Sequence, residues 1–157
     1  MRRIPLIAAL VAAVLLSLSP LGQAQQPPLV TFKHDELTIT GADGAHKFQI
    51  ELATDDAQRE QGLMFRQTMA PDAGMLFIYD HSQPVAMWME NTYIPLDMLF
   101  IAADGHIVNI RQRAVPHSQE NISSAGPVRA VLELNGGTVS RLGIKVGDKV
   151  AGPGLGQ

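Results

Sequence analysis

The chain has 157 residues and no cysteine, and its 12 basic and 15 acidic residues give a formal charge of −3 at pH 7. A protein without cysteine cannot rely on disulfides for its stability, and an acidic balance disfavours nucleic acid and anionic membranes as partners. The length suits a single domain that is large enough to bury a hydrophobic core.

The first 24 residues have the pattern of a secretory signal peptide. Arg2 and Arg3 form a positive start, residues 6–18 are apolar, and small residues stand at Gly22 and Ala24. The apolar stretch is shorter than the roughly 20 residues that a spanning helix needs, so we do not expect a retained anchor. We expect cleavage after Ala24 and a periplasmic or secreted protein with no membrane contact. Its mature chain then carries ten basic and 15 acidic residues, a charge of −5.

The rest of the chain, residues 25–151, predicts a single domain made mostly of β-strands. Nine segments are rich in apolar and β-branched residues and lie between turns that contain glycine or proline. They are residues 29–33, 37–40, 46–52, 74–79, 85–89, 96–102, 107–113, 128–134 and 149–151. Turns at residues 41–44 and 103–106 predict two hairpins.

Two short helices are predicted between these strands. Thr54 is a suitable N-cap for a helix at residues 55–61, which Gly62 can end. Thr138 similarly precedes a helix that ends at Gly143.

The remaining polar segments predict a surface loop and a loose end. Residues 116–127 are polar and contain glycine and proline, which is typical of a loop. The glycine-rich tail, residues 152–157, is expected to be disordered. We therefore predict an α+β fold with a mostly antiparallel, barrel-like β-sheet and two short helices.

Short motifs spread over nearly the whole mature chain resemble one protein family, and they occur in the same order. They are Arg59-x-x-Gly62-Leu63-Met64-Phe65-Arg66, Gly74-Met75-Leu76-Phe77, Met87-Trp88-Met89-x-Asn91-Thr92-x-Ile94-Pro95-Leu96-Asp97-Met98-Leu99-Phe100, Asp104-Gly105-x-Ile107-Val108, Val131-Leu132-Glu133-Leu134-Asn135-x-Gly137 and Gly143-Ile144-x-x-Gly147-Asp148. The chain thus resembles the domain of unknown function 192 family. Members are small, often exported single domains without an agreed activity, so the resemblance implies no catalytic role for any residue.

All six methionines after the initiator, and the single tryptophan, lie between Arg59 and Phe100. Thioethers suit Cu(I), and a cysteine-free exported protein would need Met and His to bind that ion. Met87 and Met89 would share one face of a strand, with His81 nearby in sequence. Methionine is also ordinary core filler. We favour packing over copper and predict no metal and no other cofactor.

Trp88 and Asn91 are the first candidates for a binding site. If Met87 and Met89 face the core, the tryptophan side chain points outward beside the asparagine. A ring and an amide together suit a sugar or another ring-bearing ligand. The alternative is a ring that closes the end of the barrel, with its N–H bonded to a backbone carbonyl.

Asp97 interrupts the apolar run at residues 94–101, so its carboxylate must be ion-paired, hydrogen-bonded or protonated. The expected partners are Arg59, Arg66 and the amides of residues 91–92. One interpretation makes Asp97 a general acid or base with a raised pKa. The other, which we favour, makes it a structural anchor within a local polar network.

These observations predict an exported accessory or binding domain of the cell envelope, monomeric in size. Its unknown ligand would be small and polar, or carbohydrate-like, and would lie near Arg59, Trp88, Asn91 and Asp97. A hydrolytic enzyme that uses Asp97 or Glu90 is the first alternative. Copper binding by methionine is the second.

Overall fold

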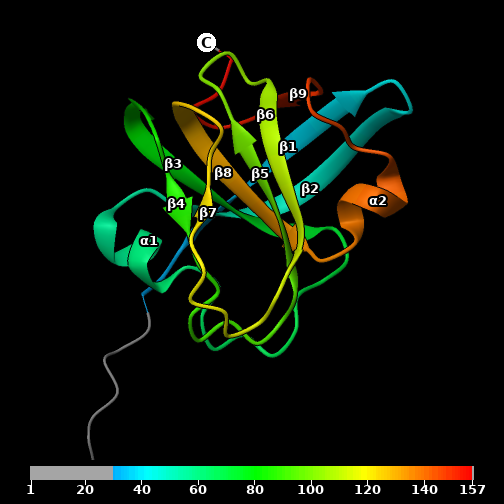
Figure 1. Ribbon diagram of the computed structural model, residues 1–157. Coiled ribbons are helices and arrows are strands. Elements are labelled where there is room, and N and C mark those ends of the chain that lie inside the picture. Colours follow the sequence, from blue (N-terminus) through cyan, green and yellow to red (C-terminus); the bar gives the residue numbers. More distant parts are fainter. Residues whose placement is uncertain (1–29, 157) are drawn as a thin grey trace, which may run out of the picture.

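The computed structural model describes residues 30–156, in which the chain forms nine strands and two short helices (Figure 1). In chain order these are β1 (Lys33–Gly41), β2 (Gly44–Ala53), α1 (Asp56–Gln61), β3 (Ala73–Gln83), β4 (Ala86–Met87), β5 (Leu96–Ile101), β6 (Ile107–Ala114), β7 (Ile122–Ser123), β8 (Val128–Asn135), α2 (Thr138–Leu142) and β9 (Lys149–Ala151). The expected signal peptide lies outside the described residues. Within them, no helix is both long and apolar enough to cross a membrane.

Seven strands form one strongly curled sheet in the order β6-β5-β8-β3-β2-β1-β9, and β4 pairs with β7 in a separate ribbon. The prediction of a mostly β fold with two short helices is confirmed, but the sheet is mixed. Strands β2 and β3 run parallel, because residues 54–72, which include α1, carry the chain back to the start of the sheet. The sheet is a half-barrel and not a closed barrel, although a bridge between His106 and Lys149 joins its edges at one point.

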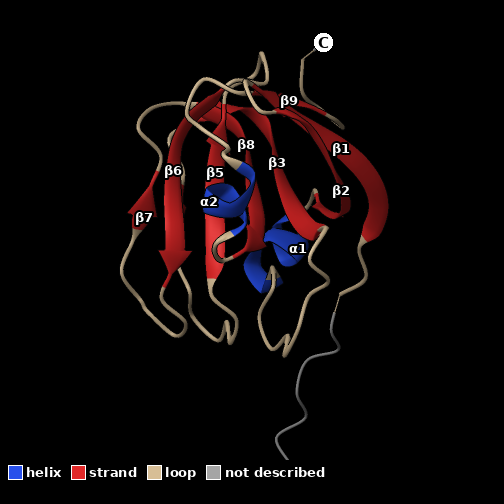
Figure 2. Ribbon diagram, turned by 90° about the vertical axis from the view of Figure 1, so that its right-hand side faces the viewer, coloured by secondary structure: helices blue, strands red, loops and turns tan. Residues whose placement is uncertain are grey.

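The two faces of the sheet carry separate cores, because successive side chains of a strand point to opposite sides. On β8, Leu132 and Leu134 belong to the first core, and Val131 belongs to the second core. Helix α2 lies across one face and α1 lies on the other side of the sheet (Figure 2). Val139 of α2 closes the first core, and residues from the segments 63–69 and 85–94 close the second.

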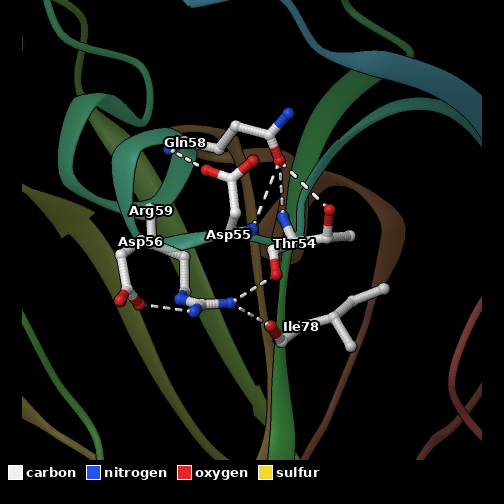
Figure 3. Close-up of polar contacts among 6 residues, drawn as sticks. All are labelled: Thr54, Asp55, Asp56, Gln58, Arg59 and Ile78. Atoms are coloured by element: carbon white, nitrogen blue, oxygen red, sulfur yellow. Dashed lines mark hydrogen bonds and ion pairs between the residues drawn. The ribbon is translucent and has the colours of Figure 1, made fainter.

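Helix α1 begins one residue later than its sequence predicts, because Asp55 and not Thr54 is the N-cap. The Gln58 N–H donates to the Asp55 carboxylate at 2.9 Å, and the Gln58 side chain accepts from the main-chain N–H groups of both Thr54 and Asp55 (Figure 3). This capping box satisfies N–H groups that the helix leaves unpaired. Gly62 ends the helix with φ 47°, as the sequence predicts.

Three local predictions need correction. The segment at residues 30–32 precedes β1, and the expected loop 116–127 contains β7, which pairs with a β4 of only two residues. The tail is not loose over residues 152–156: Leu155 is buried in the first core, and the Gly156 N–H donates to the Ala103 carbonyl at 3.1 Å. Gly154 and Gly156 flank Leu155, and their left-handed backbone allows the chain to fold back onto the sheet.

Candidate ligand-binding site

Three loops gather at one end of the sheet, below the strands in Figure 1, and we call them the loop face: residues 62–72, 88–95 and 115–121. Main-chain hydrogen bonds hold them together. The Phe65 N–H donates to Asn91 O at 2.9 Å, the His117 N–H to Thr92 O at 3.2 Å, and the Met89 N–H to Ser118 O at 2.9 Å. The loops are therefore one connected surface, although their residues are far apart in sequence.

The loop face contains most of the residues other than glycine that have left-handed backbone in the described chain. In the described chain four residues other than glycine have a positive φ, and three of them lie in these loops: Phe65 at 66°, Asn91 at 52° and His117 at 61°. Left-handed backbone is adopted more readily by asparagine and histidine than by a bulky residue such as Phe65, for which it costs about 1–3 kcal/mol. Such strain is typical of residues whose position matters for binding or catalysis.

Two of these residues, Phe65 and His117, present rings to solvent on either side of Tyr93. The rings of Phe65 and Tyr93 meet edge to face with their centroids 6.3 Å apart, and the His117 ring follows at 5.2 Å from Tyr93. Phe65 is 47% exposed and Tyr93 is 39% exposed. We call these three side chains the aromatic strip. They form a continuous, accessible row of rings that no single stretch of sequence contains.

A pocket of about 410 Å³ begins where the aromatic strip ends, and Phe65 belongs to both. Its lining comes from the segment before β1 and from β1, β2, α1 and the loop after α1. The lining residues are Val30, Thr31, Phe32, His34, Glu51, Gln61, Met64, Phe65 and Arg66. The lining therefore combines apolar and aromatic side chains with charged and amide groups.

The loop that contains Tyr93 also contains two residues singled out by the sequence. Trp88 is 50% exposed, whereas Met89 is fully buried and Met87 packs on the second core, so this alternation is as predicted. Asn91 is exposed next to the strip and gives its carbonyl to the Phe65 N–H. These two predicted residues therefore lie on the loop face.

Asp97 has a different environment from the one predicted. It is fully buried, and its carboxylate accepts from the main-chain N–H groups of Arg113 at 2.8 Å, Gly137 at 2.9 Å and Val139 at 2.8 Å. The expected ion pair with an arginine is wrong. Gly137, the N-cap of α2, has no side chain to cap the helix, and Asp97 supplies that cap from β5. Both oxygens are committed to main-chain donors, so this geometry supports an anchor and not an acid or base acting on a substrate.

Arg59 is also engaged in the fold (Figure 3). Its guanidinium donates to the carbonyls of Thr54 and Ile78, both at 2.8 Å, and pairs with Asp56 at 2.6 Å. It also lies over the Tyr79 ring, 5.5 Å from the centroid. These contacts hold α1 against β3. None of them involves Asp97.

Comparison with known proteins agrees with this fold. The family described as DUF192, "Uncharacterized ACR", matches residues 37–152. The chain belongs to the DUF192 family.

The solved structures similar to this DUF192 chain include the following two, whereas no curated protein matches it. One, from Sinorhizobium meliloti 1021, is described as a "putative transcription regulator" and is 54% identical with a TM-score of 0.78; the match covers 80% of this chain and 98% of that one. The other, from Novosphingobium aromaticivorans DSM 12444, is described as a protein of unknown function. It is 41% identical with a TM-score of 0.76, and the match covers 82% of this chain and 94% of that one.

One buried acid of this DUF192 domain is not apparent from its sequence. Glu133 is 4% exposed and lies in register between Met75 and Met98 on the side of the sheet that holds the second core. Burial raises its pKa to about 8. When acids and apolar residues alternate along a strand, the acid usually lies on the solvent side. The burial of Glu133 could therefore be predicted only by knowing that both faces of the sheet are covered. Asn135, on the same side, donates to the carbonyls of Met69 and Ala70 and so holds the first loop beside this acid.

The methionines of the DUF192 domain serve mainly as packing. Five of them, Met69, Met75, Met87, Met89 and Met98, belong to the second core or pack against it. The Met87 sulfur also accepts a hydrogen bond from the Tyr79 hydroxyl at 3.7 Å. Among the described residues, no three His, Cys, Asp or Glu side chains are grouped so that they could hold a metal ion.

Proposed function

We propose that this protein is an exported binding domain of the cell envelope that holds a carbohydrate on its loop face. The observation that carries the proposal is the aromatic strip of Phe65, Tyr93 and His117, which is exposed and continuous, with left-handed backbone at Phe65 and His117. The C–H faces of sugar rings are apolar and pack on aromatic rings, while their hydroxyls remain available to polar groups and water. A row of neighbouring rings suits successive sugars of one chain.

The backbone of the loops supports a binding role for the strip. Phe65 would be less strained if its segment relaxed, yet a main-chain hydrogen bond from its N–H to Asn91 O ties it to the neighbouring loop. A surface fixed in advance loses less conformational entropy when a ligand binds, and this raises affinity. Trp88 and Asn91, on the same loop as Tyr93, can extend the contact with a further ring and with an amide that fixes orientation.

Export remains part of the proposal because the N-terminal pattern favours it. The envelope is also where extended glycans are abundant, which agrees with a glycan-binding surface. The relative from Sinorhizobium meliloti is described as a "putative transcription regulator", but a mature charge of −5 opposes binding to DNA phosphates. We therefore do not extend that role to this chain.

The test is a binding screen of the mature protein against soluble cello-, malto- and chito-oligosaccharides of two to six sugars, followed by isothermal titration of every positive. We expect Tyr93→Ala to weaken binding about tenfold, the effect of losing about 1.4 kcal/mol of stacking. Phe65→Asn removes a ring but suits the left-handed backbone, so a loss of binding there cannot be assigned to misfolding. Val146→Ala is the matched control, because Val146 is 59% exposed but lies between α2 and β9.

Two results would contradict the proposal. One is that no oligosaccharide binds. The other is that the Tyr93 and Phe65 variants bind as tightly as the Val146 control.

A further inference from the structure

The pocket beside Phe65 is lined by an ion pair as well as by apolar side chains. The Arg66 guanidinium pairs with the Glu51 carboxylate and lies over the Phe32 ring, 5.8 Å from its centroid. The His34 ring reaches to 4.0 Å from the other Glu51 oxygen. Met64 and Phe65 contribute apolar and aromatic surface to the same pocket. The pair is therefore held in place from several sides.

This ion pair has hydrogen-bonding capacity to spare. The Glu51 and Arg66 side chains are 18% and 31% exposed, so both reach the pocket. A guanidinium has five N–H donors and a carboxylate has about four acceptor positions, whereas the described residues show one hydrogen bond between the two groups. The pocket thus offers neighbouring donors and acceptors at fixed positions.

The charges of the pocket decide what kind of ligand fits. Glu51 neutralises Arg66, so a phosphate or carboxylate would gain no net attraction and would compete with Glu51 for the guanidinium. A neutral pair of adjacent hydroxyls has neither disadvantage, because each hydroxyl both donates and accepts. The ring that carries such hydroxyls can pack its C–H face on Phe65. The volume of about 410 Å³ lies within the usual range for small-ligand pockets and has room for a sugar ring.

We propose that this pocket is an end subsite, in which Glu51 and Arg66 hydrogen-bond the adjacent hydroxyls of a terminal neutral sugar. The inference rests on the proposed function, since Phe65 joins the pocket to the aromatic strip. A chain whose last sugar occupies the pocket continues over Tyr93 and then His117. The protein therefore recognises the end of a glycan and not its interior.

The experiment compares pocket and strip variants on the same oligosaccharide series, from two to six sugars, by isothermal titration of the mature protein. Glu51→Gln and Arg66→Met each remove one charge and keep much of the side-chain shape. We expect each to weaken binding at least tenfold, by a factor that is the same for every chain length, because every chain has one end. Tyr93→Ala should instead cost more for longer chains, because only these reach past Phe65. Urea unfolding of each variant verifies that the fold is intact.

The outcomes separate this inference from the proposed function. If Tyr93→Ala weakens binding while Glu51→Gln and Arg66→Met bind like wild type, the end subsite is wrong and the strip stands. If the pocket variants lose binding and the strip variants do not, the subsite stands without the strip. If inorganic phosphate binds the wild type and displaces the oligosaccharide, the pocket is an anion site and the inference is overturned. Absence of binding by every oligosaccharide overturns both.

Discussion

The buried acid at Glu133 gives the most demanding test of the structure. Burial raises its pKa from 4.5 to about 8, and it lies between Met75 and Met98 at 4% exposure. Between these two pH values the folded protein holds a proton that the unfolded chain releases. The contribution of Glu133 to stability is therefore fully present below pH 4.5 and is lost as the pH rises toward 8. Each pKa unit corresponds to 1.36 kcal/mol, so the total loss over this window is about 5 kcal/mol.

Glu133→Gln replaces the acid with a neutral side chain of similar shape that does not titrate. At pH 4.5 the variant and the wild type should differ by less than about 1 kcal/mol, because both side chains are then uncharged in the folded state. At pH 8.5 the variant should be more stable by about 3–5 kcal/mol, since it avoids the ionisation of a buried group.

The assay is urea unfolding at half-unit steps from pH 4.5 to 8.5, with the free energy of unfolding taken from each curve. Glu120→Gln is the matched control, because the Glu120 side chain is 66% exposed. Its profile should run parallel to that of the wild type. If the Glu133→Gln profile also runs parallel to the wild type, the carboxyl ionises freely in the folded protein and the argument from burial is refuted.

Four further expectations follow from the fold and the sequence. Asp97→Asn should lower the free energy of unfolding by about 2–4 kcal/mol in urea, because an amide cannot accept all three main-chain hydrogen bonds; an unchanged midpoint would exclude the anchor. Phe65→Asn should leave stability unchanged or raise it by up to about 1 kcal/mol, since asparagine tolerates the left-handed backbone, and a clear loss in the same assay would contradict the strain. Met87→Leu should cost less than about 1.5 kcal/mol, and a competition titration should detect no Cu(I) affinity tighter than micromolar; one-to-one tight binding lost in this variant would favour copper. The intact mass of protein from the envelope fraction should correspond to a chain that begins at Gln25, and a soluble form that keeps Met1 would refute export.

Local signals predicted much of the fold. Glycines at positions 41 and 44 close the first hairpin at the residues expected, with Gly41 opposite Gly44. The start of α1 lies one residue after the one predicted from Thr54, and Gly62 ends the helix as predicted. Such features depend on neighbours in sequence, so a single chain reveals them. The parallel pairing of β2 with β3 cannot be predicted in this way. It depends on where a 19-residue connection returns to the sheet, which is a property of the whole sheet.

The candidate site was predictable only in part, because it also depends on contacts between residues that are far apart in sequence. The apolar run around Asp97 correctly indicated a buried carboxylate. The partners of this carboxylate are main-chain N–H groups up to 42 residues away, which no side-chain pattern in the sequence can predict. Trp88 and Asn91 were found by local alternation. Tyr93 and Phe65 were missed, because the strip exists only after three loops meet. Of the three residues with left-handed backbone, Asn91 and His117 are of types that often adopt it, whereas Phe65 is not.

Main-chain hydrogen bonds hold the loop face together, so the support of this surface does not depend on the side chains that it exposes. The hydrogen bonds between Phe65 and Asn91, and between His117 and Thr92, use only N–H and C=O groups, which every residue except proline possesses. Substitution of the outward side chains therefore preserves the hydrogen bonds between the loops, provided that the new residues accept the left-handed backbone. The arrangement resembles a display scaffold: a library of variants at positions 65, 88, 93 and 117 should yield folded proteins with new specificities, as the loops of antibody domains do on a constant framework.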